Sequence, residues 1–267
     1  GSTTKWPWNW VYRREGNKLL EYERRIAREF DWSTFVSAEE SACFKALAPE
    51  SAAKISFFQN GVDREYFNPE LRYSNPFGSD EKSIVFTGAM DYWANVEAVC
   101  WFARKVFPEV RRNVTSARFY IVGSNPAPHV RALNRDDIVV TGGVADIRPY
   151  LAHAKAVVAP LRIARGIQNK VLEAMAMGCP VFASPQAATG IKVTSGREII
   201  VEDNPKILSQ QIVLQLDRCR YEGMRKSSRD FISRHYTWLD NLTALGDYLE
   251  TEKPAISLSD RPAVSEV

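Results

Sequence analysis

The sequence predicts an α/β protein with a doubly wound parallel sheet and helices on both faces. Three observations lead to this prediction. With 267 residues and 45% hydrophobic composition, the chain is large enough for one large or two modest cores. From residue 83 onward, short apolar segments alternate regularly with helical segments, which is typical of a parallel sheet. Residues 156–183 contain a complete strand, loop, helix and strand, which form one βαβ unit.

The expected elements follow the chain in order. Residues 5–30 show helical spacing, with Leu19, Tyr22, Ile26 and Phe30 on one apolar face. A strand at 32–37, a helix at 38–47 and a strand at 54–58 form a βαβ fragment that is too small to be a complete domain. Ser37 is the expected N-cap of that helix, and Glu40 holds the capping-box position. We expect further strands at 84–88, 119–123, 138–141, 156–160, 180–183 and 198–201, and helices at 96–112, 129–134, 147–154, 167–177, 205–216, 218–235 and 238–250.

Composition and charge exclude several kinds of function. The net charge of +3, from 35 Lys+Arg against 32 Asp+Glu, argues against a nucleic-acid binder that relies on bulk charge. The four cysteines and three histidines do not cluster, so we expect reduced thiols, no disulfide framework and no metal site. The sequence has no apolar run of membrane-spanning length and no opening signal peptide. A cytoplasmic protein is the resulting expectation, and a peripheral position at the inner membrane face is left open.

The tryptophans near the start of the chain have two readings. Trp6, Trp8 and Trp10 flank Pro7 ahead of the charged part of the first helix. We favour packing in a core or between domains. The alternative is a patch that contacts a bound substrate or the surface of a membrane.

The central βαβ unit carries the candidate binding residues. Its helix is almost entirely apolar and small, so it should be buried, yet it bears Lys170 and Glu173 three positions apart on one face. These two charges could simply pair with each other. The preceding loop adds Arg162 and Arg165 at a helix N-terminus, where backbone N–H groups and the helix dipole favour an anion. The pattern indicates a phosphate-bearing ligand, with Glu173 free to accept hydrogen bonds from hydroxyls.

Five segments in register resemble one enzyme family. They are QNGVDREYFNP, FTGAMDYWANVEAV, FYIVG, VTGGVADI and GIQNKVLEAMAMGCPVFAS. They occur in this order in the retaining glycosyltransferases of family 4, also called group 1, and the resemblance covers about residues 54–250. It implies the GT-B architecture, in which two Rossmann-like domains face each other across a cleft. The segment ARGIQNKVLEAMAMG is similar to bacterial exopolysaccharide sugar transferases, including those linked to exosortase systems.

The resemblance assigns roles to individual positions. Glu173 matches the second glutamate of the family's Glu-x7-Glu motif, which grips the ribose hydroxyls, as suits a carboxylate that can accept two hydrogen bonds. Lys170 and Arg165 match positions beside a diphosphate. The resemblance also assigns backbone contacts, with Gly166 and Ile167 facing the diphosphate, Gly88 in the turn under the phosphates and donor sugar, and Gly143 and Val144 in the loop that frames the base.

The sequence departs from the family pattern at two places. Arg165 stands where the first glutamate of Glu-x7-Glu is expected. The usual Arg and Lys after the glycine-rich turn are replaced by Ala89 or Met90 and by Asn95. We expect Arg165, Lys170 and Arg162 to supply the missing positive charge. The alternatives are that the two arginines are solvated loop residues and that Asn95 only caps the helix that follows it.

The resemblance also implies a domain organisation. Residues 1–3 look like a cloning remnant, and residues 4–60 resemble the end of an N-terminal acceptor domain. A linker at 61–83, a nucleotide-sugar-binding domain at 84–236, a returning helix at 237–252 and a flexible tail at 253–267 complete the chain. Because family members have a longer N-terminal half, we expect this chain to be truncated and its activity to be uncertain.

The expected reaction is retaining transfer of a sugar from a nucleoside-diphosphate sugar to a glycan or lipid-linked acceptor, in polysaccharide biosynthesis. The donor is a substrate, and neither a cofactor nor a metal is expected. One alternative is a sugar-nucleotide 2-epimerase of the same fold, which should carry several acidic and histidine residues in the cleft. A non-catalytic nucleotide-binding module is another. A plain Rossmann-type oxidoreductase is disfavoured, because neither FYIVGSNPAP nor IVFTGAM supplies G-x-G-x-x-G.

Overall fold

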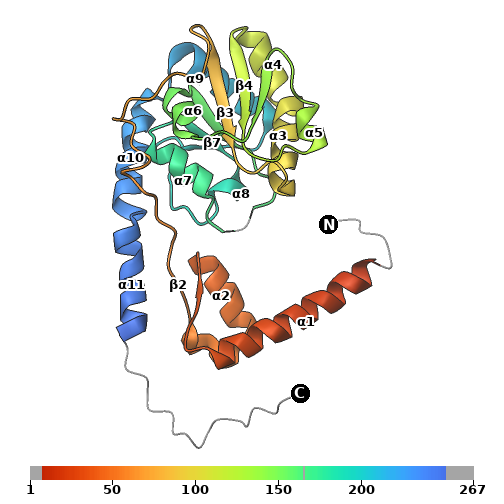
Figure 1. The fold of residues 1–267 in the computed structure, drawn as a ribbon, viewed down its shortest axis with the longest axis vertical. Helices are drawn as coiled ribbons and strands as arrows, with labels where there is room; N and C mark the ends of the chain where they lie inside the picture. Colours follow the sequence, from red (N-terminus) through yellow and green to blue (C-terminus); the bar gives the residue numbers. More distant parts are fainter. Residues whose placement is uncertain (1–7, 165, 251–267) are drawn as a thin grey trace, which may run out of the picture.

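The computed structural model describes residues 8–164 and 166–250. Most of these residues belong to a domain built around one parallel six-stranded sheet. Its strand order is β5-β4-β3-β6-β7-β8, so the predicted doubly wound parallel sheet is confirmed (Figure 1). Trp6, Arg165 and the expected tail at 253–267 lie outside the described residues. The strands of this sheet are β3 (Lys82–Thr87), β4 (Ala117–Val122), β5 (Ile138–Gly142), β6 (Ala156–Ala159), β7 (Val181–Ala183) and β8 (Ile200–Val201).

The strand order reverses between β3 and β6, which places helices on both faces of the sheet. The chain proceeds outward from β3 through β4 to β5, and then returns to β6 and proceeds the other way. Because such crossovers are right-handed, the helices of the two halves lie on opposite faces. α3, α4, α5 and α9 pack together on one face, and α7 packs against α10 on the other. The helices are α3 (Trp93–Lys105), α4 (Phe107–Asn113), α5 (Pro128–Arg131), α6 (Arg148–His153), α7 (Asn169–Ala176), α8 (Pro185–Ala188), α9 (Pro205–Arg218) and α10 (Glu222–His235).

The core of this domain is apolar on both sides of the sheet. Phe102 and Phe119, whose ring centroids are 4.7 Å apart, pack with Phe107 beneath the α3–α4 corner. β6, β7 and five of the eight residues of α7 are buried, as the small apolar composition of these segments predicts. A rigid, buried βαβ unit therefore supports the charged side chains at the start of α7.

One expected helix is in fact two. The structure ends α3 at Lys105 and starts α4 at Phe107, instead of the single helix expected at 96–112. Pro108 is the physical reason, because proline has no N–H to continue the ladder and its ring clashes with the carbonyl four residues earlier. At the first turn of a new helix the same residue is tolerated, and there Pro108 lies in α4.

The N-terminal part forms a small separate layer below the large sheet (Figure 1). β1 (Ser33–Phe35) pairs in parallel with β2 (Ile55–Phe57), and α2 (Ala38–Leu47) and the short 3-10 helix η1 (Pro49–Lys54) connect them. α1 (Trp8–Glu29) crosses beneath them. The small core of this layer consists of Ala27, Phe44, Ala48 and Ile55, with Leu20 and Phe35 packed against it.

The prediction that Leu19, Tyr22, Ile26 and Phe30 form the buried face of the first helix is wrong. Leu19, Tyr22 and Phe30 are exposed, and the helix instead contacts the small core through Leu20 and Ala27. Trp10 is also exposed, at 61%, instead of packing in a core or between domains. Helical periodicity identified the helix, but the contacts that decide its inner face come from residues far along the chain.

Two chain segments, around residues 60–62 and 236–241, run side by side between the large sheet and the N-terminal layer. Val62 N–H donates to the carbonyl of Tyr236 (2.8 Å), and Asn241 Nδ2 donates to the carbonyl of Asn60 (3.2 Å). A Cβ atom on Gly61 would lie 2.6 Å from the backbone nitrogen of Trp238, so only glycine fits this crossing. α11 (Trp238–Glu250) continues from here past the N-terminal layer (Figure 1).

The carboxyl ends of β3 and β4 approach each other closely at two glycines. Gly123 has φ +158°, and a Cβ atom added there would lie 1.7 Å from the carbonyl oxygen of Gly88. Backbone hydrogen bonds hold both glycines in place. Gly88 N–H donates to Val122 O (3.1 Å), and Gly123 N–H donates to Gly142 O (3.1 Å). The turns after these strands are thereby locked together.

We expect Gly123→Ala to lower the free energy of unfolding by at least about 3 kcal/mol, because the new methyl group must displace backbone. Gly142→Ala is the matched control at the end of the adjacent strand. It has φ +70° but nothing within 4 Å of the added atom, so it should cost only about 1–2 kcal/mol of backbone strain. Urea unfolding of both variants measures the difference. Equal losses would contradict the close approach.

Candidate functional site

A polar pocket opens where the strand order reverses. In open parallel sheets, ligands bind beyond the carboxyl ends of the strands at this reversal, where the adjacent loops diverge to opposite faces. Here the pocket has a volume of about 440 Å³ and receives residues from the loops after β3, β4 and β5 and from α7. Its lining is Thr87, Gly88, Ala89, Asn95, Gly123, Ser124, Gly143, Val144, Ile147, Lys170 and Glu173.

Backbone forms much of the pocket wall. Gly88, with φ +150°, leaves space that a side chain would fill, since an added Cβ would lie 2.8 Å from Asn95 Nδ2 and 2.9 Å from Lys170 Nζ. Among the hydrogen bonds of the described residues, none uses the backbone N–H of Ala89, Ser124 or Val144 as a donor. Unpaired N–H groups lining a polar pocket are suited to bind an anion.

Lys170 lies in the first turn of α7 and bridges the reversal point. Its ammonium donates to Asn95 Oδ1 at 2.5 Å and lies 4.4 Å from the centroid of the Phe86 ring. Asn95 Nδ2 in turn donates to the carbonyl of Ala89 at 2.8 Å. A chain of contacts therefore runs from α7 through α3 to the glycine-containing turn after β3.

These contacts decide two alternatives that the sequence left open. Asn95 is not the cap of α3, because the helix begins at Trp93 with Tyr92 as N-cap, and the Asn95 side chain instead holds Lys170 and the loop. Lys170 and Glu173 do not pair directly. Among the hydrogen bonds and ion pairs of the described residues, none joins them, although each charge stabilises the other at longer range.

Burial changes the acid–base properties of both charged groups. Desolvation lowers the pKa of Lys170 to about 8, and the Glu173 carboxylate only partly opposes this shift. Desolvation also raises the pKa of Glu173, against the effect of Lys170. The carboxylate of Glu173 makes no hydrogen bond with the described residues, so its acceptor positions face the pocket unused. Both groups would gain from a ligand that supplies negative charge and hydroxyl groups.

The structure brings six of the predicted residues together. Gly88, Asn95, Gly143, Val144, Lys170 and Glu173 all line the pocket. Gly166 and Ile167 lie in the loop before α7, outside this lining. Arg162 is 59% exposed at its side chain, pairs with Glu97 at 3.8 Å and borders a different pocket of about 280 Å³. Arg165 lies outside the described residues. The ligand roles of all these residues remain predictions.

Sequence reasoning missed further lining residues. They are Thr87, Gly123, Ser124 and Ile147. The signal was present, since the carboxyl ends of neighbouring parallel strands meet at one edge, and the segment FYIVG had been identified as a strand. Applying the same rule to every strand end would have found Thr87 after β3 and Ser124 after β4.

Contacts of Asp146 and Arg148 hold the loop after β5, which borders the pocket. Asp146 accepts from the backbone N–H of Arg148 (2.8 Å) and pairs with its guanidinium (2.7 Å), and this pairing lowers the pKa of the Asp146 carboxyl. The guanidinium also stacks on Tyr66, 3.8 Å from the ring centroid. Gly143 and Val144 thus lie on a loop tied to the segment before β3.

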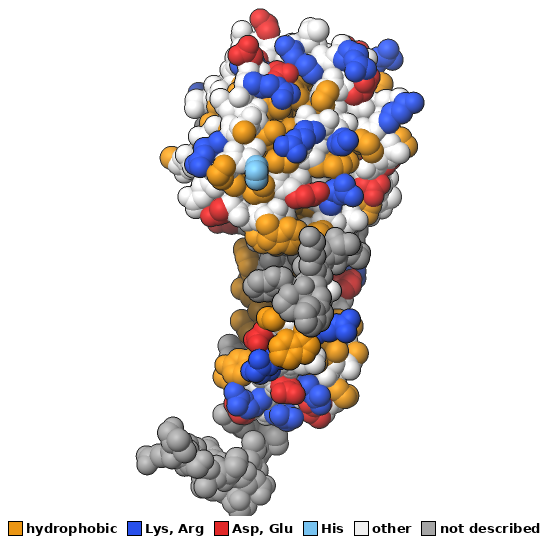
Figure 2. Space-filling view, turned by 90° about the vertical axis from the view of Figure 1, so that its right-hand side faces the viewer, with side chains coloured by type: hydrophobic (Ala, Val, Ile, Leu, Met, Phe, Trp, Pro, Cys, Tyr) orange, Lys and Arg blue, Asp and Glu red, His pale blue; other side chains and the backbone are white. Residues whose placement is uncertain are grey.

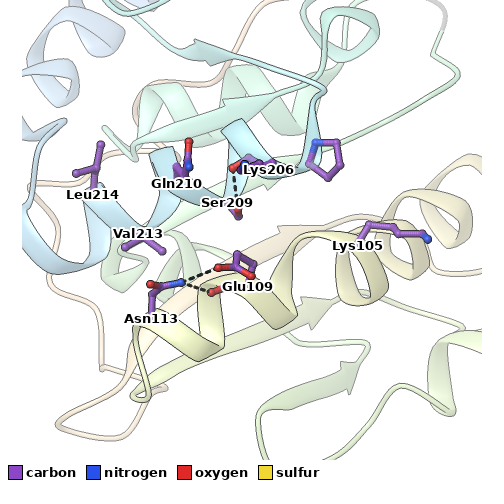
Figure 3. A pocket seen from close by; sticks show the side chains of 9 residues that line it. Lys105, Glu109, Asn113, Lys206, Ser209, Gln210, Val213 and Leu214 are labelled. Atoms are coloured by element: carbon purple, nitrogen blue, oxygen red, sulfur yellow. Dashed lines mark hydrogen bonds between the residues drawn. The ribbon is translucent and has the colours of Figure 1, made fainter.

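A larger pocket elsewhere lacks these features. It has a volume of about 640 Å³ and lies between α4 and α9 (Figure 3). Several of its polar side chains are paired within their own helices: Asn113 Nδ2 donates to Glu109, and Ser209 Oγ donates to the Lys206 carbonyl. It is distant from the strand reversal and presents no buried charge, so we assign the site to the smaller pocket.

The surface and the helices add little to the choice of ligand. On the face seen in Figure 2, positive and negative side chains are interspersed. Within the part of the chain that the structure describes, no group of three His, Cys, Asp or Glu is placed to hold a metal ion. None of the described helices combines the length and hydropathy needed to cross a membrane.

Comparison with protein families identifies the chain. The family model described as "Glycosyl transferases group 1" matches residues 81–218, just over half of the sequence. The chain belongs to the group 1 glycosyl transferases. The matched region begins one residue before β3 and ends with α9, so it contains all the elements that line the pocket. No curated protein matches the chain significantly.

Solved structures show the same fold at low sequence identity. A glycosyltransferase from Rickettsia africae has a TM-score of 0.69 and 15% identity, over 88% of this chain and 68% of its own. HepE of Anabaena, in complex with UDP and glucose, has a TM-score of 0.68 and 13% identity, over 87% and 67%. Sucrose-phosphate synthase from Thermosynechococcus elongatus has a TM-score of 0.66 and 17% identity, over 87% and 61%. These similarities confirm the GT-B fold.

The lowered pKa of Lys170 predicts a pH-dependent affinity for a diphosphate ligand. Below about pH 8 the amine is charged and attracts the diphosphate, whereas above it the unliganded protein must take up a proton to bind, so affinity falls by up to about 10-fold per pH unit. The sugar conjugate of whichever of UDP, GDP and ADP binds suits the measurement, because its diphosphate does not titrate in this range. Titration calorimetry from about pH 6.5 to 9, below the ionisation of a uracil or guanine ring, should show the decline for the wild type and none for Lys170→Met. A flat wild-type profile would contradict the prediction.

Proposed function

We propose that this protein binds a nucleoside-diphosphate sugar in the pocket at the strand reversal and, as part of a retaining family-4 glycosyltransferase, transfers the sugar to a glycan or lipid-linked acceptor. Exopolysaccharide biosynthesis is the proposed setting. Family membership and the GT-B fold support the reaction class, and the arrangement of Lys170 and Glu173 supports the donor class.

The observation that carries the proposal is one partly buried cation and one unpaired carboxylate in the same pocket. The two groups are complementary to different parts of one ligand. A half-buried carboxylate without a hydrogen-bond donor suits a vicinal diol such as ribose, and an ammonium beside free backbone N–H groups suits a diphosphate. HepE of Anabaena was crystallised with UDP and glucose, and we extend that ligand class to this chain.

In the proposed reaction the protein stabilises the leaving diphosphate. Negative charge develops on the diphosphate as the glycosidic bond breaks, and the Lys170 ammonium is largely desolvated, so its charge acts strongly there. The first N–H groups of α7 add a favourable dipole, since Lys170 lies in the first turn of that helix. We propose that Arg165, Gly166, Ile167 and, more remotely, Arg162 complete this positive region. The proposal does not require a metal ion.

We further propose a division of the chain. Residues 4–60 would belong to the acceptor domain, 61–83 to a linker, 84–236 to the donor domain and 237–252 to a helix that returns to the acceptor side. The hydrogen bonds of Val62 with Tyr236 and of Asn241 with Asn60 support this division, because they hold the two crossing segments together. A cytoplasmic location and a peripheral membrane contact belong to the same proposal.

Glu173→Ala should weaken nucleotide binding by about 10- to 100-fold, because it removes the acceptor of two hydrogen bonds to the ribose. Thermal-shift screening with UDP, GDP and ADP first identifies the base, and titration calorimetry then measures the affinity. Glu109→Ala is the matched control, since it removes a half-exposed carboxylate of α4 that does not line the pocket.

Unchanged nucleotide affinity in Glu173→Ala would contradict the assignment of the ribose contact. A wild-type protein that binds none of the three nucleotides would contradict the proposed function itself. To separate transfer from epimerisation, the intact protein is incubated with the sugar nucleotide it binds, without acceptor. Hydrolysis alone supports a transferase, and conversion into a 2-epimer favours the alternative enzyme.

A further inference from the structure

The N-terminal layer reaches the loop that precedes the site helix. Gly166 has φ +64°, and a Cβ atom added there would lie 3.4 Å from Val36 Cγ2 and 3.5 Å from both carboxylate oxygens of Glu40. Glu40 belongs to the first turn of α2, which Figure 1 shows below the loop between β6 and α7. Residues more than 120 positions apart in the sequence therefore face each other across this gap.

The direction of the strands explains this placement. β1 runs parallel to β2, and only Val36 and Ser37 separate the end of β1 from the start of α2. The first turn of α2 therefore lies at the carboxyl end of the small sheet, just as the pocket lies at the carboxyl end of the large one. The two carboxyl ends face each other, which is the arrangement in which a ligand bound to one sheet is accessible to side chains of the other.

The Glu40 side chain does not cap its own helix. In a complete capping box, the N-cap hydroxyl accepts from the N3 backbone N–H, and the N3 carboxylate accepts from the N-cap backbone N–H. Only the first half is formed, with Glu40 N–H donating to Ser37 Oγ at 3.1 Å. The Glu40 carboxylate makes no hydrogen bond or ion pair with the described residues, although the residue is partly buried.

We propose that Glu40 binds the hydroxyl groups of the donor sugar, so that the N-terminal layer supplies a carboxylate beside the loop at Gly166. This inference rests on the proposed function and extends it from the nucleotide to the sugar. A carboxylate is suited to the task because it accepts two hydrogen bonds from neighbouring hydroxyls. In the family pattern, the first glutamate of Glu-x7-Glu stands where this chain has Arg165. Glu40 would supply the carboxylate that this position lacks.

The position of Gly166 strengthens the assignment. The residue needs a left-handed backbone, and the added atom would reach the Glu40 carboxylate at van der Waals distance. Lys170 lies one helical turn further along the chain, in the pocket proposed for the diphosphate. Since the sugar is attached to the diphosphate, it should extend from that pocket toward the N-terminal layer. The partly buried Glu40 carboxylate lies on that side and can accept hydrogen bonds from the sugar hydroxyls.

The test compares affinities for a nucleotide and for its sugar conjugates. Titration calorimetry on the full chain uses whichever of UDP, GDP and ADP binds, together with its glucose, mannose and N-acetylglucosamine conjugates. Glu40→Gln should bind the free nucleotide with unchanged affinity and lose about 10-fold in affinity for the conjugate that the wild type prefers. Glu39→Gln is the matched control, because it removes the same charge from the preceding position of α2, and it should leave both affinities unchanged.

Three results would overturn the inference. If Glu40→Gln weakens the nucleotide and its conjugates equally, Glu40 only positions the loop. If every conjugate binds Glu40→Gln as it binds the wild type, Glu40 does not contact the sugar. If Glu39→Gln gives the same selective loss, the effect belongs to the charge at the start of α2. Failure of the wild type to bind any nucleotide would instead reject the proposed function, and this inference with it.

Discussion

The hydrogen bond between Lys170 and Asn95 holds the candidate site together. It joins α7 to α3, two helices that lie on opposite faces of the sheet, at the point where the strand order reverses. Its geometry requires glycine at position 88, because any side chain there would occupy the space of both groups. It also requires burial, and the resulting desolvation lowers the pKa of Lys170 to about 8. One contact thus links the fold, the shape of the pocket and its electrostatics.

The rest of the pocket depends on backbone more than on side chains. The turns after β3 and β4 are locked by the close approach of Gly123 to Gly88, and Asp146 and Arg148 fix the loop after β5. Rigid turns keep N–H groups directed into the pocket without the entropy loss that ordering flexible side chains would cost. The charges of the pocket are concentrated at Lys170, proposed for the diphosphate, and at Glu173, proposed for the ribose hydroxyls.

The two layers of the structure contribute unequally to the site. The large sheet provides the pocket proposed for the nucleotide, whereas the small N-terminal layer provides Glu40 through the first turn of α2. The layers meet at the crossing of Gly61 and Trp238, where no side chain fits on the glycine. A change of angle at this crossing would alter the distance between Glu40 and the loop at Gly166, so the crossing and the sugar-binding proposal are geometrically connected.

Local patterns in the sequence were sufficient for the large sheet, for the βαβ unit around Lys170 and Glu173, and for most of the pocket. This is because parallel strands bring their carboxyl ends to one edge regardless of side-chain detail. The split of the expected helix at Pro108 could also have been read from the local chemistry of proline.

What only the tertiary structure decided were contacts between residues distant in sequence. Examples are Asn95 binding Lys170 instead of capping its helix, and Leu20 and Ala27 forming the inner face of α1. Glu40 facing Gly166 instead of closing its capping box is a third. The physical reason is the same in each case. Periodicity and capping rules describe energies within one element, and the partner that finally satisfies a polar or apolar side chain is set by packing between elements.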